Sequence, residues 1–254
     1  MLRSEFKQLL DLTLSPHRFK DYAPNGLQVE GKNNITRVVT GVTACQALID
    51  AAIEYGADAI VVHHGYFWKN EAPEITGIKY RRVSALIKND ISLFGYHLPL
   101  DAHPVYGNNA GLANALGLSA KRRPLQANLP LEEAIGVVGE LDQALTVEAF
   151  KCLVEKSVGR SVLLEAVSDK HIKTVALCTG GAQGYIEQAH QAGADVFITG
   201  EVSEQTIHLA RELGIHFIAA GHHATERFGA QAIAAFLRDE HGMDAVFIDI
   251  DNPA

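Results

Sequence analysis

Cysteine is scarce in this sequence, with three residues among 254, at positions 45, 152 and 178. They are odd in number and widely spaced, and no two form a CxxC pair, which argues against a disulfide framework. Cys45 lies close to the start of a predicted helix, where the pKa of a thiol is lowered. We expect ordinary buried or helical cysteines, with a reactive Cys45 as the alternative.

The sequence also lacks a long apolar run and an excess of positive charge. No apolar stretch is long enough to span a bilayer. The 22 lysines and arginines against 30 aspartates and glutamates give a net charge of −8. This charge argues against binding to the phosphate backbone of a nucleic acid, although a negative net charge is compatible with a local basic patch. The opening segment Met1–Phe6 carries an acid, and no apolar signal core follows it. We therefore expect a cytoplasmic protein with no membrane partner and no nucleic acid partner.

The apolar residues that are present alternate between two patterns, which predicts an α/β fold. Short β-branched runs are typical of buried strands of a parallel sheet, and segments with helical spacing separate them. Strands are predicted at Arg37–Val42, Ala59–Val62, Ile91–Tyr96, Lys173–Cys178, Ala194–Glu201, Ile215–Ala220 and Ala245–Ile248. Helices are predicted at Ser4–Leu14, Gln46–Tyr55, Tyr80–Asn89, Thr146–Val158 with Thr146 as N-cap, Glu204–Leu213 and Gly229–Glu240.

The two halves of the chain are similar to each other. Residues 38–58 can be laid on residues 175–195 without a gap, so that Gly56-Ala57-Asp58 falls on Gly193-Ala194-Asp195. A second alignment, with a different shift, lays a His-x-x-x-acid pattern of one half on that of the other. We therefore expect two related α/β lobes with a metal cleft between them.

The expected first lobe covers residues 1–125 and contains His63, His64 and Asp101. The second covers residues 126–254 and contains His222 and Glu226, and the two lobes are free to interleave. Three basic residues before a proline, at Lys121–Pro124, predict an exposed linker near the boundary.

Two adjacent histidines, His63 and His64, follow directly on a predicted buried strand and precede Gly65. Ligands of open α/β sheets gather beyond the carboxyl ends of the strands. A glycine permits a turn there, so the two rings could converge on one pocket and present neutral nitrogen ligands to a metal. Two surface histidines are the alternative. The aromatic cluster Tyr66-Phe67-Trp68 comes next, either as a pocket wall or as part of a core.

Other histidines and acids also lie at predicted strand ends. The candidate metal ligands are His63, His64, Asp101, His222 and Glu226. These five donors suit Zn²⁺, Mn²⁺, Fe²⁺ or Ni²⁺ without selecting among them, and they suffice for two ions with open positions for water.

Several further positions leave alternatives open. His97 and Glu201 are candidate catalytic residues, with a ligand-orienting or a structural role as the alternative for His97 and a helix-capping role as the alternative for Glu201. His103 and His223 either orient a ligand or are structural. The glycines at 180, 181 and 184 either cradle a phosphate or form a tight turn.

Four segments together resemble the Nif-three-like family, whose members carry the label GTP cyclohydrolase 1 type 2 homologue. The segments are Val61–Trp68, His97–Asp101, Thr199–Val202 and Gly221–Glu226. Residues 21–29 also resemble the enterobacterial members, and the match covers nearly the whole chain. The resemblance implies two α/β lobes, a two-metal site with the five ligands named above, and a toroidal homohexamer built as a trimer of dimers.

The sequence is compatible with three functions. The first is a metal-dependent hydrolase of a nucleotide or a similar small molecule, because two ions with open positions activate water. The second is a metal chaperone or buffer that uses the same residues. The third is a ring-shaped scaffold whose metal is structural.

Overall fold

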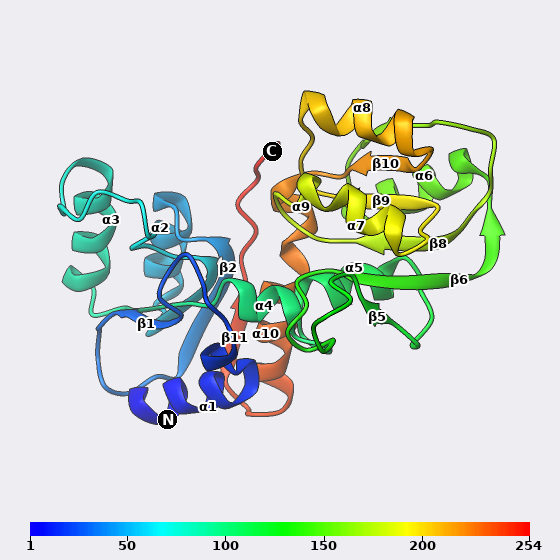
Figure 1. Ribbon diagram of the computed structural model, residues 1–254. Helices are drawn as coiled ribbons and strands as arrows, with labels where there is room; N and C mark the ends of the chain where they lie inside the picture. Colours follow the sequence, from blue (N-terminus) through cyan, green and yellow to red (C-terminus); the bar gives the residue numbers. More distant parts are fainter. The chain divides into compact units, whose positions relative to one another are not determined.

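The computed structural model describes all 254 residues, which form two compact units. Unit 1 contains Met1–Leu100 and Gly229–Asp251, and unit 2 contains Asp101–Phe228 and Asn252–Ala254. Each unit has its own sheet (Figure 1). None of the helices has the length and apolar character that a membrane crossing requires.

Unit 1 is built on a five-stranded sheet in the order β1-β4-β3-β2-β11. All neighbours are parallel except β1, which pairs antiparallel with β4. The strands are β1 (Gly26–Val29), β2 (Arg37–Thr43), β3 (Ala59–His64), β4 (Ser92–Gly95) and β11 (Asp244–Phe247). The helical elements are α1 (Arg3–Leu14), η1 (Pro16–Arg18), α2 (Gln46–Tyr55) and α3 (Gly77–Lys88). Two further helices, α4 (Leu98–Ala102) and α10 (Arg227–Asp239), each begin in one unit and end in the other.

The core of unit 1 follows from the sequence pattern. Strand β3 is buried from Ala59 to His63, as expected for a β-branched run covered on both faces. Helix α2 buries Leu48, Ile49 and Ala52, whose spacing places them on one side of the helix. These side chains pack in one cluster with residues of β2, β3 and β4.

Unit 2 is built on a six-stranded sheet in the order β5-β6-β8-β9-β10-β7. The central strands β8, β9 and β10 are parallel, and the outer strands are antiparallel to their neighbours. The strands are β5 (Arg123–Pro124), β6 (Val137–Leu145), β7 (Leu163–Glu165), β8 (Ile172–Leu177), β9 (Val196–Thr199) and β10 (His216–Ala219). The helical elements are α5 (Asn108–Ala115), α6 (Val147–Val158), η2 (Gln183–Tyr185), α7 (Ile186–Gln191), α8 (Glu204–Leu213) and α9 (His222–Thr225).

The two units share one local structure, as the internal repeat predicts. In unit 1 the Asp58 carboxylate accepts hydrogen bonds from the backbone N–H groups of Thr36 and Arg37, at 2.7 and 2.9 Å. In unit 2 the Asp195 carboxylate accepts from residues 173 and 174, at 2.9 and 2.8 Å. Each aspartate also has a lysine partner. The aspartate therefore ties the start of one strand to the start of the next in both units.

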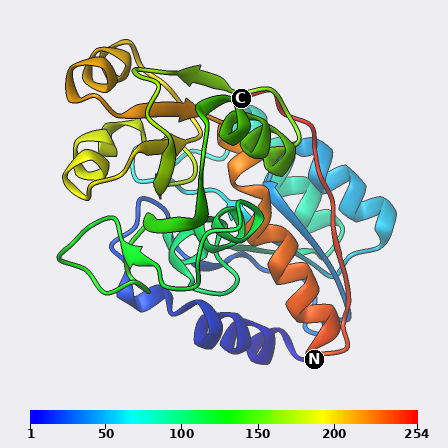
Figure 2. The ribbon, with the colours of Figure 1, turned by 90° about the vertical axis from the view of Figure 1, so that its right-hand side faces the viewer.

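The chain divides at other places than residue 125. The second unit begins at Asp101, so this aspartate lies with His222 and Glu226, and residues 229–251 return to unit 1. The return has a clear cause, because β11 extends the unit 1 sheet by pairing parallel with β2. Figure 2 shows α10, drawn in orange to red, as the continuous helix that leads there.

The basic segment Lys121–Pro124 is not the exposed linker that its composition predicts. Arg123 and Pro124 form β5 and pair with β6. Arg122 donates hydrogen bonds to the Asn114 side chain and to the carbonyl of residue 110, at 2.5 and 3.3 Å. The prediction rested on charge alone and was wrong, because carbonyl and amide oxygens can accept the hydrogen bonds of a guanidinium while its aliphatic part packs against the protein.

Candidate metal-binding site

Three histidines of unit 1 lie together at the carboxyl ends of two neighbouring parallel strands. His63 and His64 end β3, and His97 follows two residues after the end of β4. The ring centroids are 4.4 Å apart for His63 and His64, 5.0 Å for His63 and His97, and 5.7 Å for His64 and His97. One nitrogen of each ring lies within 4.8 Å of the others. The predicted convergence of the first two rings is therefore observed, and His97 joins them.

The backbone orients His63. Its Nδ1 lies 3.2 Å from the carbonyl oxygen of Tyr96, which accepts only, so Nδ1 carries the proton and Nε2 carries the lone pair. His64 has its Nδ1 3.2 Å from the Thr43 hydroxyl, which lies at the end of β2. A neutral imidazole whose second nitrogen is held by an oxygen is the usual form of a histidine ligand.

His97 is oriented by Asp21, a residue that the sequence analysis did not single out. The Nδ1 of His97 lies 2.7 Å from the Asp21 carboxylate, whose side chain is 3 % exposed. The same carboxylate accepts hydrogen bonds from the backbone N–H groups of Tyr22 and Leu98 and from the Asn25 side chain, at 2.6, 2.9 and 2.9 Å. Burial raises the pKa of Asp21, but these hydrogen bonds and His97 outweigh it and lower the pKa to about 2. No spacing rule connects Asp21 with His97, because 76 residues separate them.

Unit 2 holds a second set of acids and a histidine, also beyond its parallel strands. His222 opens α9, directly after β10, and its Nε2 lies 3.2 Å from the Glu226 carboxylate. Its Nδ1 lies 2.7 Å from the carboxylate of Glu201, which follows β9. The hydrogen bond with Glu226 is the largest influence on the pKa of His222 and, with Glu201, raises it to about 9 against the opposing effect of burial.

The glycine-rich turn after β8 makes room for this set. Gly180 has a φ of +71°, and a Cβ added there would lie 2.1 Å from Oε1 of Glu226. At Gly181 a Cβ would come within 3.3 Å of the Glu201 carboxylate. The turn therefore faces carboxylates, which favours the tight-turn interpretation over a phosphate cradle.

Asp101 is held in place by neutral donors of unit 2. Its Oδ1 accepts hydrogen bonds from the Asn108 side chain at 3.0 Å and from the Thr179 hydroxyl at 3.2 Å. Asp101 is 6 % exposed and Glu226 is 3 % exposed. Burial raises the pKa of the nearby Cys178 thiol well above its usual value, and the charges of Asp101 and Glu226 add to this. Cys178 is therefore a structural cysteine, and all three cysteines are free.

His103 has a local structural role. Its Nδ1 accepts hydrogen bonds from the backbone N–H groups of Val105 and Tyr106, at 3.2 and 2.9 Å, and its ring stacks on that of Tyr106. The imidazole thus closes the turn between α4 and α5.

The donors present fit divalent ions of the first transition series. The unit 1 set offers imidazole nitrogens, and the unit 2 set offers carboxylate oxygens with one imidazole. Mixed nitrogen and oxygen donors suit Zn²⁺, Fe²⁺, Mn²⁺ and Ni²⁺. His63 and His222 each have Nδ1 within hydrogen-bond distance of a protein oxygen, and such a second contact is typical of histidine ligands.

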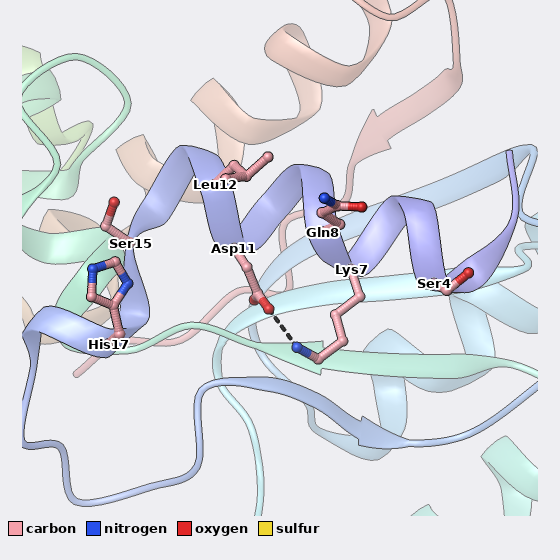
Figure 3. Close-up of a pocket in the computed structure, with 7 residues that line it drawn as sticks. All are labelled: Ser4, Lys7, Gln8, Asp11, Leu12, Ser15 and His17. Carbon is pink, nitrogen blue, oxygen red and sulfur yellow. Dashed lines mark hydrogen bonds and ion pairs between the residues drawn. The ribbon is translucent and has the colours of Figure 1, made fainter.

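A hollow on α1 does not share these features (Figure 3). Its volume is about 390 Å³, and its lining includes one histidine, His17, and one carboxylate, Asp11. The carboxylate pairs with Lys7 and accepts a hydrogen bond from the Tyr96 hydroxyl at 2.6 Å. The hollow therefore offers no set of metal ligands.

Comparison with known proteins places the chain in one family over its whole length. Residues 1–253 match the profile of the Duf34/NIF3 family (NGG1p interacting factor 3). A Haemophilus influenzae protein named GTP cyclohydrolase 1 type 2 homolog is 53% identical over 251 residues, which cover 98% of either chain. The chain therefore belongs to the DUF34/NIF3 family, as its strand-end motifs predict.

Solved structures agree with this assignment. A structural-genomics protein described as ybgI, of unknown function, superposes with a TM-score of 0.94 at 48% identity, with both chains covered completely. Protein TTHA1606 of Thermus thermophilus superposes with a TM-score of 0.88 at 34% identity, over 100% of this chain and 99% of the other. The predicted α/β class is confirmed by the two sheets and by these matches.

Proposed function

We propose that this protein is a metal-dependent hydrolase that acts on a nucleotide or a similar small molecule. The observation that carries the proposal is the arrangement of donors at strand ends. Each unit ends its parallel strands in potential ligands whose orientation is fixed by further hydrogen bonds. The relatives named GTP cyclohydrolase 1 type 2 homolog support a nucleotide as the substrate class.

Two divalent ions per subunit are the proposed cofactors. His63, His64, Asp101, His222 and Glu226 are the proposed ligands, and Zn²⁺, Fe²⁺, Mn²⁺ and Ni²⁺ all suit them. When bound, such ions lower the pKa of a coordinated water and polarise a phosphoryl or carbonyl oxygen. Binding to His222 requires that its Nε2 give up the proton it now shares with Glu226.

His97 is the proposed acid–base residue. Asp21 holds the proton of His97 on Nδ1, so Nε2 is available to accept a proton from water or to return it to a leaving group. Glu201, the other candidate catalytic residue, contacts Nδ1 of His222, and its proposed role is to orient the ring of His222 toward the metal. A direct role as general base would need Glu201 to leave that contact.

The proposal keeps the assembly that the family resemblance implies and the location expected from the sequence. A homohexamer in the form of a ring, made as a trimer of dimers, and a cytoplasmic location complete it. Native mass spectrometry of the purified protein measures the first of these directly, and a monomer would contradict it.

Metal content tests the ligand assignment. We expect His63→Ala and Glu226→Gln each to lose at least one metal equivalent per chain, measured by elemental analysis. His208→Ala and Glu204→Gln are matched controls, because both side chains are more than half exposed on α8 and form only a surface pair. Metal contents of His63→Ala and Glu226→Gln equal to those of the controls would contradict the assignment.

Turnover separates the hydrolase from a metal buffer. We expect metal-loaded protein to hydrolyse at least one nucleotide or phosphoester of a screened panel, with the Glu226 variant as blank. His97→Gln should lower kcat by 10²-fold or more while it keeps its metal, as general acid–base catalysis predicts. Rapid metal exchange without turnover would favour the metal buffer instead.

A further inference from the structure

Two aromatic side chains of unit 1, those of Trp68 and Tyr22, lie near the ring of His97. The Trp68 ring lies 4.9 Å from the His97 ring at an interplanar angle of 82°, and it lies 5.9 Å from the His64 ring. The centroid of the Tyr22 ring lies 6.5 Å from that of the His97 ring, at an interplanar angle of 63°. The histidines of unit 1 therefore have an aromatic border made of residues from two loops.

The structure separates Trp68 from its two aromatic neighbours in the sequence. Tyr66 is 5 % exposed and packs in the core of unit 1, and Phe67 packs against the same cluster. Trp68 is half-buried and does not belong to that cluster, and Tyr22 is 63 % exposed. Burial in a core thus accounts for Tyr66 and Phe67, but it does not account for Trp68 and Tyr22.

Backbone contacts hold both aromatic residues in place. The N–H of Lys69 donates to the carbonyl of Tyr22 at 2.7 Å, which ties the two loops together. The indole N–H of Trp68 donates to the carbonyl of Gly65 at 3.2 Å, and the N–H of Tyr22 donates to Asp21. Phe67, between them, has a φ of +64°, a conformation that costs a non-glycine residue free energy. These contacts tie the two loops together, and Asp21 hydrogen-bonds both the ring of His97 and the backbone N–H of Tyr22.

We propose that Tyr22 and Trp68 form a subsite for the nucleobase of the substrate. Aromatic side chains stack on bases through their π-faces with little preference for the identity of the base. An exposed tyrosine offers such a face without rearrangement of the protein. The subsite places a planar heteroaromatic ring beside His97, the proposed acid–base residue. This inference rests on the proposed function for the role of the ring, but the subsite itself binds whether or not catalysis follows.

The single tryptophan of the chain makes the subsite measurable. Because Trp68 is the only indole, any change in tryptophan fluorescence reports on this position. The probes are AMP, GMP, CMP and UMP, with ribose 5-phosphate as the probe that has the same sugar phosphate and no base. They are titrated into Zn²⁺-loaded protein and into metal-stripped protein.

We expect the nucleotides to change the Trp68 emission and to bind at least tenfold more tightly than ribose 5-phosphate. Tyr22→Ala should weaken nucleotide binding roughly tenfold or more, as loss of a stacking partner predicts, and leave the affinity for ribose 5-phosphate unchanged. Tyr22→Phe should restore most of the affinity. Tyr80→Ala is the control, because Tyr80 is 55 % exposed on α3.

Several outcomes would overturn the subsite. They are equal affinities for ribose 5-phosphate and every nucleotide, no emission change with any nucleotide, and equal nucleotide affinities for Tyr22→Ala and Tyr80→Ala. A different set of results would contradict the proposed function. If no nucleotide is turned over and His63→Ala keeps its metal, while base-dependent binding persists, then the subsite stands without the hydrolase.

Discussion

Three histidines, His63, His97 and His222, each have Nδ1 committed to an oxygen of the protein. The oxygen is a carbonyl in the first case and a carboxylate in the other two. For His222, the hydrogen bonds with Glu226 and Glu201 raise the pKa to about 9 against the opposing effect of burial. Neighbouring acceptors thus give identical side chains different chemistry.

Asp21→Asn tests how much the buried carboxylate contributes. A carboxyl whose pKa falls from 3.8 to about 2 on folding stabilises the folded state by about 2 kcal/mol at neutral pH. This contribution is fully present above the unfolded pKa and is lost as the pH falls through the folded pKa. We therefore expect the free energy of unfolding of the unaltered protein to drop between pH 4 and pH 2, and that of Asp21→Asn to drop less. Denaturant titrations at these pH values measure both, and parallel pH profiles would contradict the role of Asp21.

Gly180→Ala tests the close approach of the turn to Glu226. A methyl group 2.1 Å from Oε1 forces Glu226 or the backbone to move, and the φ of +71° adds strain of about 1 kcal/mol or more. We expect a lower melting temperature and less bound metal. Gly184→Ala is the matched control, because a Cβ at that glycine meets nothing within 4 Å. Equal metal contents and melting temperatures of the two variants would refute this assignment.

At the scale of elements, the repeated β-α-β segment positions the candidate metal-binding residues. Asp58 and Asp195 join neighbouring strand starts in the two units, so the strand ends also lie in register and carry His64 and Glu201 to the ligand sets. The pKa of each aspartate is raised by burial, but the lysine partner and the backbone N–H donors lower it overall. Both aspartates therefore stabilise the folded state when ionised.

Asp58→Asn and Asp195→Asn should have similar effects because their surroundings match. Each variant loses charge-assisted hydrogen bonds to two backbone N–H groups, which costs about 1.5–3 kcal/mol at neutral pH. The stabilisation is fully present above the unfolded pKa of aspartate and is lost as the pH falls through the lower pKa of the folded state, so the difference from the unaltered protein should shrink in acid. Chemical denaturation at pH 7 and pH 3 measures this. A large effect of one variant and none of the other would show that the two segments are not equivalent.

At the scale of the whole molecule, each of the two units folds around its own sheet, and a bound metal would stabilise the folded chain. A ligand that binds only the folded state stabilises it by about 2.7 kcal/mol at a concentration one hundred times its Kd. For a chain of this length we expect the melting temperature to rise by about 5–10 °C on addition of the correct ion. Differential scanning calorimetry of stripped and reloaded protein measures it, and His63→Ala should show a smaller rise.

The oligomeric state should not depend on the metal if the ions are catalytic. We expect metal-stripped protein to keep the molar mass of its oligomer in light scattering, because the proposed ions act on water and substrate and do not hold subunits together. Dissociation on stripping, reversed by metal, would favour the scaffold function over the hydrolase.

Sequence periodicity determined the elements and most of the fold class. The bounds of α2 and α8 coincide with the predicted ones, and Thr146 caps α6 as its position indicates, with its hydroxyl accepting a hydrogen bond from the N–H of residue 149. Such elements depend on local spacing, capping and glycine stops, which are written in neighbouring residues. The paired histidines and acids at strand ends were likewise visible, because a parallel sheet gathers its strand ends at one edge.

Only the tertiary structure decided which distant residues serve the histidines. Asp21 and Tyr22 lie in an ordinary turn sequence, and nothing near them in the chain indicates that His97 is their partner. The same holds for the return of residues 229–251 to the first sheet and for the placing of Asp101 in the second unit, where Asn108 and Thr179 donate to it. Contacts between residues far apart in the chain depend on how the sheets are ordered, and strand order leaves no period in the sequence.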